Sequence, residues 1–95
     1  MREFKDEPAG VIASKLVTGD RQESYGDPMV SLDRIAAVWS GLLGVVITRR
    51  NVAHMMVALK LCRDVNKPGA DNEVDICGYA HLLQFDREEQ EYDDD

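Results

Sequence analysis

Two pairs of charged residues stand where two apolar helices are expected to carry hydrophobic side chains. Lys60 and Arg63 lie in the apolar stretch 52–63, and Asp71 and Asp75 open the next one. Each pair is separated by three or four residues, about one helical turn, so both members share one face of their helix. Lys and Arg bind phosphate oxygens, and Mg²⁺ prefers carboxylates. The pairs predict either an interhelical salt-bridge lattice or a site for a phosphate and its metal.

A polar connector adds further chemistry ahead of these helices. Segment 19–28 reads Gly-Asp-Arg-Gln-Glu-Ser-Tyr-Gly-Asp-Pro, and polar connectors on a rigid scaffold often carry function. A tyrosine ring, here or in the last helix, can stack on a base. The predicted ligand-binding residues are Arg21, Tyr25, Lys60, Arg63 and Tyr79, and the predicted Mg²⁺ ligands are Asp71 and Asp75.

Helix-end electrostatics alone would produce the same charge pattern. The two acids fall in the first turn of a helix and the two bases fall near the end of one, where each sign of charge interacts favourably with the helix dipole. A connector that ends in Asp27-Pro28 is equally a turn followed by a helix cap. The residues alone therefore leave the structural and the ligand-binding hypotheses open.

The spacing of apolar residues predicts an all-α protein. Four stretches have helical periodicity: 8–18, 28–43, 49–65 and 71–84. The last helix either ends near residue 84 or continues into the acidic segment that follows. The third is apolar nearly all round, which is typical of a helix buried on several sides, either centrally in the monomer or against another subunit. A short turn makes the last two stretches antiparallel neighbours. We expect a small four-helix unit that is completed by homo-oligomerisation.

Several other side chains have a predicted environment. The run 45–47, Val-Val-Ile, is expected to be an extended connector whose side chains fill the core. Cys62 and Cys77 lack metal-ligand spacing, and we expect both to be buried in the protein as free thiols. Free thiols are typical of a protein in a reducing compartment. Arg49 and Arg50 open a helix against the dipole preference. They are expected to be an exposed pair, and the alternative is that they face a partner or an anion.

The chain's acidity is concentrated at its C-terminal end. The last ten residues hold seven acidic residues and one basic residue, so they carry −6 of the formal charge of −7. We predict a single helical domain over 1–85 and a solvated acidic tail over 86–95. This charge balance argues against binding to duplex nucleic acid, because binding a phosphate backbone needs clustered excess Lys and Arg. No apolar run approaches the length of a membrane span, and we expect a protein that is cytoplasmic or acts inside a host cell.

A set of short motifs resembles a family of small uncharacterised phage and prophage proteins, over 19–83. The motifs are Gly19-Asp20-Arg21, Tyr25-Gly26-Asp27, Ile35-Ala36, Trp39-Ser40, Met55-Met56, Leu59-Lys60, Arg63, Asp71-Asn72, Asp75 and Gly78-Tyr79-Ala80. The layout is more distantly similar to the all-α nucleoside triphosphate pyrophosphohydrolases of the MazG-like group. Those proteins bind Mg²⁺ through Glu-x-x-Glu and Glu-x-x-Asp and form dimers or tetramers.

This resemblance implies a nucleotide or another phosphorylated small molecule as ligand, with Mg²⁺ as cofactor. Only Asp71 and Asp75 match the metal pattern, and Asp33 is the only acid in 28–43. A protein with this partial set would bind without cleaving, so whether it is an enzyme stays open. The alternatives are an anti-defence protein that sequesters a signalling nucleotide or blocks a host protein, and an oligomeric helical interaction module without a small-molecule site.

Overall fold

The structure is a computed structural model that describes residues 8–18 and 27–90, with the side chains of 8–14 and 27–90. Its helices are α1 (Ala9–Thr18), α3 (Pro28–Leu43), α4 (Arg49–Asn66) and α5 (Ala70–Gln90). No strand occurs in the described residues, which confirms the predicted all-α class. None of these helices combines the length and the apolar character that a bilayer crossing requires.

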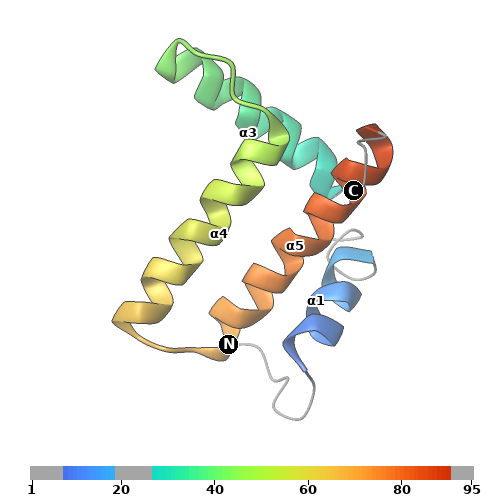
Figure 1. The fold of residues 1–95 in the computed structure, drawn as a ribbon, viewed down its shortest axis with the longest axis vertical. Coiled ribbons are helices and arrows are strands. Elements are labelled where there is room, and N and C mark those ends of the chain that lie inside the picture. Colours follow the sequence, from blue (N-terminus) through green and yellow to red (C-terminus); the bar gives the residue numbers. More distant parts are fainter. Residues whose placement is uncertain (1–7, 19–26, 91–95) are drawn as a thin grey trace.

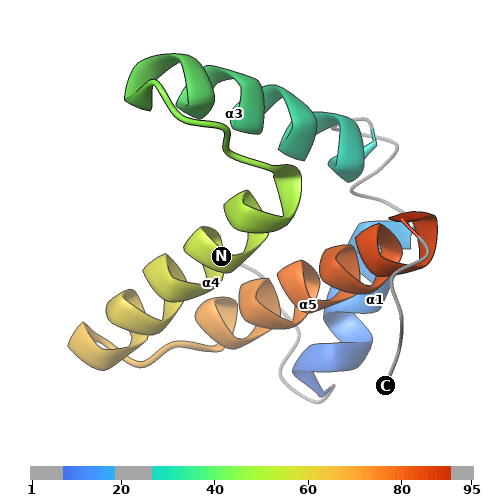
Figure 2. The same cartoon turned by 45° about the horizontal axis from the view of Figure 1, so that its top comes forward.

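The helices are arranged around an antiparallel hairpin. α4 and α5 form this hairpin, and α1 packs on the side of α5 that faces away from α4 (Figure 1). α3 lies across the end of the hairpin where α4 begins and α5 ends (Figure 2). The far end of α3 projects beyond this crossing, and the connector returns from it to the start of α4.

Local signals set both ends of α3. The Asp27 carboxylate accepts a hydrogen bond from the Met29 amide at 2.9 Å, and Pro28 occupies the first turn. At the other end Gly44 has φ 69°, a left-handed conformation that favours glycine, and its amide donates to the Ser40 carbonyl at 2.9 Å. The predicted bounds of this helix are confirmed.

The connector between α3 and α4 is tied down at its last residues. The Ser40 hydroxyl accepts from the Ile47 amide at 2.7 Å and donates to the Ile47 carbonyl at 3.2 Å. Ile47 packs against the main core as predicted, but Val45 and Val46 are exposed. The prediction that the whole run fills the core is wrong for these two valines, because the bonds to Ser40 fix only the end of the connector.

Hydrogen bonds also define both ends of α4. Thr48 and Asn51 form a reciprocal capping box, with amide-to-side-chain distances of 3.0 and 3.1 Å. In the turn to α5, the Asp64 carboxylate accepts from the Gly69 amide at 3.1 Å and from the Asn72 side-chain amide at 3.3 Å. This turn makes α4 and α5 antiparallel neighbours, as the sequence predicts.

The described residues form two cores. The main core, where α3, α4 and α5 meet, contains the buried residues Met29, Leu32, Ala36, Val52, Ala53 and Leu82. The second core, where α1 covers α5, contains Ile12, Ala13 and Val74. Cys77 is half-buried against the second core, but Cys62 is exposed, so its predicted burial is wrong. Only one side of α4 is covered, and Cys62 lies on another side.

α5 continues into the acidic segment, which is the second of the two ends that the sequence left open for this helix. It runs to Gln90, so residues 86–90, which the sequence analysis placed in the acidic tail, are helical. Asp86 is among its buried residues. Residues 91–95 lie outside the described part of the chain. The helix therefore brings one acidic residue of the predicted tail into the core of the protein.

Candidate functional site

One stripe of α4 faces one stripe of α5, and each stripe carries a charge at both ends. Eleven residues separate Arg49 from Lys60, and eleven separate Asp75 from Asp86. Eleven residues are close to three helical turns, so each like-charged pair shares one face. Because the helices are antiparallel, Arg49 meets Asp86 and Lys60 meets Asp75. Two salt bridges therefore bracket the apolar contact and match its register.

Lys60 and Asp75 neutralise each other. The Lys60 Nζ lies 3.1 Å from the Asp75 Oδ2, and the two side chains are largely covered, with 16% and 18% exposed. The sequence leaves two roles open for these residues, a salt bridge between helices or a site for a phosphate and its metal. The contact has the geometry of the salt bridge. In a phosphate-binding role the three N–H groups of the Lys60 ammonium would be shared between this carboxylate and the phosphate.

The salt bridge is expected to couple the stabilities of the two positions. Lys60→Ala and Asp75→Ala should each destabilise the protein, and the double variant should lose about 1 kcal/mol less than the sum of the two losses. Urea denaturation of the four proteins measures this coupling. Lys67→Ala, at an exposed position in the turn, is the control and should change the free energy of unfolding little. Strictly additive losses at 60 and 75 would contradict the salt bridge.

A second charged cluster lies at the other end of the hairpin, around a buried carboxylate. Asp86 is 2% exposed, and its Oδ1 accepts a hydrogen bond from the Arg49 Nε at 2.8 Å. Its Oδ2 accepts from the Arg50 Nη1 at 3.3 Å, and the same Nη1 donates to the Leu83 carbonyl at 3.1 Å. Two arginines of α4 therefore compensate the one buried carboxylate of α5.

Two exposed carboxylates complete this cluster. The Arg49 Nη1 lies 3.5 Å from the Asp33 Oδ2 of α3, and the Nη2 lies 3.1 Å from the Glu89 Oε2. The contact with Glu89 is short, but it lacks the angles of a hydrogen bond, and the buried Nη2 has no hydrogen-bond partner among the described residues. The hydrogen bond to Asp86 raises the pKa of the Arg49 guanidinium, and the negative charges of Glu89 and Asp33 raise it further. Burial of the guanidinium lowers the pKa, but by less than these interactions raise it.

The predicted exposure of the arginine pair is wrong for Arg49, which is about nine-tenths buried, and Arg50 is about one-third exposed. The prediction considered only the dipole of α4 and assigned Asp86 to a solvated tail. A signal was present in the sequence, because Tyr79, Leu82 and Asp86 recur at three and four residues and so share one face of α5. Continuing that stripe past Phe85 would have identified the buried acid.

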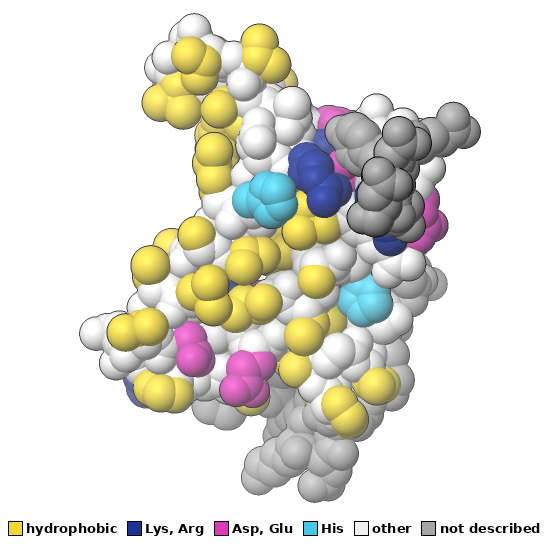
Figure 3. Space-filling view, in the orientation of Figure 1, with side chains coloured by type: hydrophobic (Ala, Val, Ile, Leu, Met, Phe, Trp, Pro, Cys, Tyr) yellow, Lys and Arg dark blue, Asp and Glu magenta, His cyan; other side chains and the backbone are white. Residues whose placement is uncertain are grey.

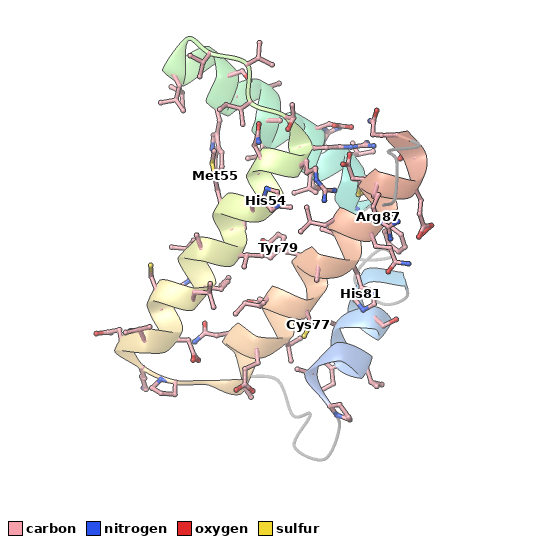
Figure 4. All side chains as sticks on the ribbon, in the orientation of Figure 1. His54, Met55, Cys77, Tyr79, His81 and Arg87 are labelled. Atoms are coloured by element: carbon pink, nitrogen blue, oxygen red, sulfur yellow. The ribbon has the colours of Figure 1, made fainter. Side chains whose placement is uncertain are left out.

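The structure describes three of the other predicted site residues, which lie at different positions on the α4–α5 hairpin: Arg63, Asp71 and Tyr79. Arg21 and Tyr25 lie outside the described residues. Arg63, in the last turn of α4, and Asp71, in the first turn of α5, are both exposed. Tyr79 is half-buried against the main core and lies between α4 and α5 (Figure 4). Its role as a stacking platform stays a prediction.

The predicted metal ligands lie one turn apart at the start of α5. Within the described residues no group of three or more His, Cys, Asp or Glu side chains is placed to hold a metal ion. Asp71 and Asp75 could supply at most two carboxylates, which is the number that Mg²⁺ commonly takes from a protein when a substrate phosphate supplies further oxygens. Asp75 is already paired with Lys60. Mg²⁺ binding stays a prediction.

A large apolar surface is the third feature of the molecule. Seven exposed side chains form what we call the elbow surface, on the projecting half of α3, the connector and one side of α4: Val38, Leu42, Leu43, Val45, Val46, Met55 and Leu59. Hydrophobic side chains cover the end of α3 and the flank of α4, with a hollow between them (Figure 3). Met55 lies on the side of α4 nearest the projecting end of α3 (Figure 4).

These features define a small all-α protein built on a helical hairpin, and residues 11–85 match a family described as a domain of unknown function, DUF6378. The chain belongs to this family. Over 74 residues it is 39% identical to the Gene 55 protein of Mycobacterium phage L5 and 34% identical to the Gene 55 protein of Mycobacterium phage D29. No solved structure matches it.

These relatives are longer proteins. Each alignment covers 76% of this chain but only 47% of the L5 protein and 48% of the D29 protein, so the chain spans about half the length of the curated relatives it matches. The predicted resemblance to a family of small phage proteins is confirmed. The more distant similarity to MazG-like pyrophosphohydrolases stays a prediction.

Proposed function

We propose that this protein is a phage-encoded, self-associating helical interaction module. The observation that supports the proposal most directly is the balance of its apolar side chains. Nine hydrophobic residues are buried in the described part of the chain, whereas eleven large hydrophobic side chains are exposed there. Single exposed hydrophobes are ordinary, but a contiguous apolar surface is typical of a protein interaction site.

The burial of α4 supports the same conclusion. A helix that is apolar nearly all round is buried centrally in its monomer or against another subunit. In this structure only Val52 and Ala53 of α4 are buried, while Met55 and Leu59, which belong to the elbow surface, are exposed. α4 is therefore not central among the described helices, and contact with another subunit would account for the apolar side chains that it leaves exposed.

The available apolar surface is sufficient for association. Covering the seven partly exposed side chains of the elbow surface would contribute roughly 1 kcal/mol each, or about 7 kcal/mol in all. The loss of translational and rotational freedom when two molecules associate opposes this gain by several kcal/mol. Two copies each contribute such a surface, so the gross gain exceeds the cost, and a dimer in the micromolar range is expected.

Self-association is tested by measuring the mass of the protein in solution over a range of concentrations. We expect light scattering to give a multiple of the monomer mass, and we expect the melting temperature to rise with protein concentration, because association stabilises only the folded state. A monomer mass at every concentration up to about 100 μM, with a constant melting temperature, would rule out this function.

Nucleotide binding is a second proposal, supported by the charges where α4 ends and α5 begins. Lys60, Asp75 and the exposed Arg63 and Asp71 lie toward the same end of the hairpin. In this proposal the two acids hold Mg²⁺ while Lys60, Arg63 and Arg21 neutralise phosphates, either for attack by water or for sequestration of a signalling nucleotide from host defence.

A nucleotide panel with Mg²⁺ tests this second proposal. If it holds, one nucleotide should raise the melting temperature of the protein, and Arg63→Ala should abolish the rise. Arg34→Ala, which removes an exposed arginine of α3, is the matched control and should preserve it. Pyrophosphate release would distinguish hydrolysis from sequestration. If no nucleotide shifts the melting temperature or releases pyrophosphate, nucleotide binding is ruled out. The anti-defence alternative is then the blocking of a host protein.

A further inference from the structure

We infer that a second copy of this chain covers the elbow surface, in a two-fold dimer where the projecting end of α3 of each copy lies in the hollow between α3 and α4 of the other. This inference rests on the proposed self-association and specifies its surface. The projecting end of α3 carries Leu42 and Leu43. The connector that follows it carries Val45 and Val46, and Val46 is 87% exposed.

Both arms of the elbow surface continue apolar stripes that begin in the main core. On α3 the stripe runs through Leu32, Ala36, Trp39 and Leu43, at spacings of four, three and four residues. Its first two residues are buried, Trp39 is half-buried and Leu43 is exposed. The helix therefore keeps a core-forming face beyond the point where α4 and α5 cover it.

The stripe on α4 behaves in the same way. Val52, Met55 and Leu59 recur at three and four residues and share one face of the helix. Val52 is fully buried, whereas Met55 and Leu59 are exposed at 41% and 45%. Since the two stripes leave the core from the same crossing, they bound the hollow on both sides.

The absence of charge favours a second copy as the occupant. Residues 35–48 and 51–59 contain no Asp, Glu, Lys or Arg. A second copy presents the same uncharged surface, so pairing the two buries no unpaired ion. Each chain has both a hollow and a projecting end. Two copies related by a two-fold axis can therefore each place a projecting end in the hollow of the other, which gives a closed dimer.

The segments of the printed sequence that lie outside the described residues are rich in charged residues, unlike the elbow surface. The segments outside the described residues are 1–7, 19–26 and 91–95. They hold five, three and four charged residues respectively, and none contains a run of apolar residues. Placing any of them on the elbow surface would bury charges without partners.

The extent of the surface agrees with a dimer interface. A standard interface takes about 800 Å² from each partner, and about two-thirds of a homodimer interface is apolar, so roughly 500 Å² of apolar surface is needed per copy. Seven large side chains with exposures from 41% to 87% provide an area of that order. The elbow surface is therefore large enough to hold the dimer without a third component.

Leu42→Glu tests the inference, with Leu61→Glu as the matched control. Leu42 is 77% exposed on the projecting end of α3, and Leu61 is 52% exposed on a different face of α4 from Met55 and Leu59. We expect light scattering to give a dimer for the wild type and for Leu61→Glu and a monomer for Leu42→Glu. Circular dichroism should show equal helix content in all three, because neither leucine is in the core.

Val46→Glu, on the connector, is the second test variant and should also give a monomer. If Leu42→Glu and Val46→Glu both remain dimeric, the inference about the elbow surface is wrong, although self-association stands. A trimer or larger assembly of the wild type would contradict the two-fold exchange. A monomeric wild type would remove the proposed function and this inference together, so the two failures are distinguishable.

Discussion

Replacing Asp86 by alanine is expected to lower the free energy of unfolding by about 3 to 5 kcal/mol, because it leaves a largely buried arginine without its main counter-ion. Asp86 is 2% exposed and accepts hydrogen bonds from Arg49 and Arg50. Urea denaturation of the wild type and the variant at neutral pH measures the loss. The effect should be large because the cluster joins α3, α4 and α5, so disrupting it weakens the attachment of all three helices.

Asp33→Ala is the matched control for this prediction. Asp33 contacts the same arginine at 3.5 Å, but its side chain is 58% exposed, so its loss should cost less than about 1 kcal/mol. Combining Arg49→Met with Asp86→Leu should cost less than Asp86→Ala alone, because apolar residues of similar size leave no buried charge. If Asp86→Ala and Asp33→Ala cost the same small amount, Asp86 is solvated in the protein and the cluster is not buried.

The parts of the fold that the sequence predicts are those set by neighbouring residues. Asp27, Pro28 and Gly44 act on the backbone within a few positions of themselves, so both ends of α3 follow from local chemistry. The same holds for Thr48 at the start of α4. The antiparallel hairpin follows from a connection that is too short for any other arrangement.

The parts that the sequence does not predict depend on contacts between distant segments. Whether Arg49 is exposed depends on Asp86, which is 37 residues away. From local composition, Asp86 belongs to a run of acidic residues and is predicted to be solvated. It is buried because α5 extends to Gln90 and carries Asp86 on the face that packs against the other helices. The candidate site is similar, because spacing put Lys60 and Asp75 on facing helices but could not decide whether they would contact each other or a ligand.

Hydrophobic periodicity has the same limit on α3 and α4. It identifies the face that is suited to burial, but it does not identify which molecule buries it. The stripe from Leu32 to Leu43 reads as one core face, yet only its first half is covered in the monomer. In the uncovered half the packing against α4 and α5 has ended, and this is why the elbow surface became visible only in the structure.

Leu82→Ala is expected to destabilise the protein by about 3 kcal/mol, through lost burial and the cavity that remains. Leu82 is 6% exposed in the main core. It precedes Asp86 by one turn, as Ala53 follows Arg49 by one turn, so the hairpin register places Leu82 opposite Ala53. Urea denaturation measures the loss, and Leu61→Ala, at an exposed position, should cost less than about 1 kcal/mol.

The two salt bridges on either side of Leu82 should limit how far the helices can move into this cavity. With Arg49–Asp86 on one side and Lys60–Asp75 on the other, α4 and α5 are held at a fixed separation and cannot close on the vacated space. A leucine supplied from the opposite helix should fill it, so adding Ala53→Leu to Leu82→Ala should restore much of the lost stability. Ala53→Leu alone should destabilise by about 1 to 3 kcal/mol through overpacking. If the double variant is no more stable than the sum of its parts, Leu82 and Ala53 do not share one space, and the register set by the salt bridges is wrong.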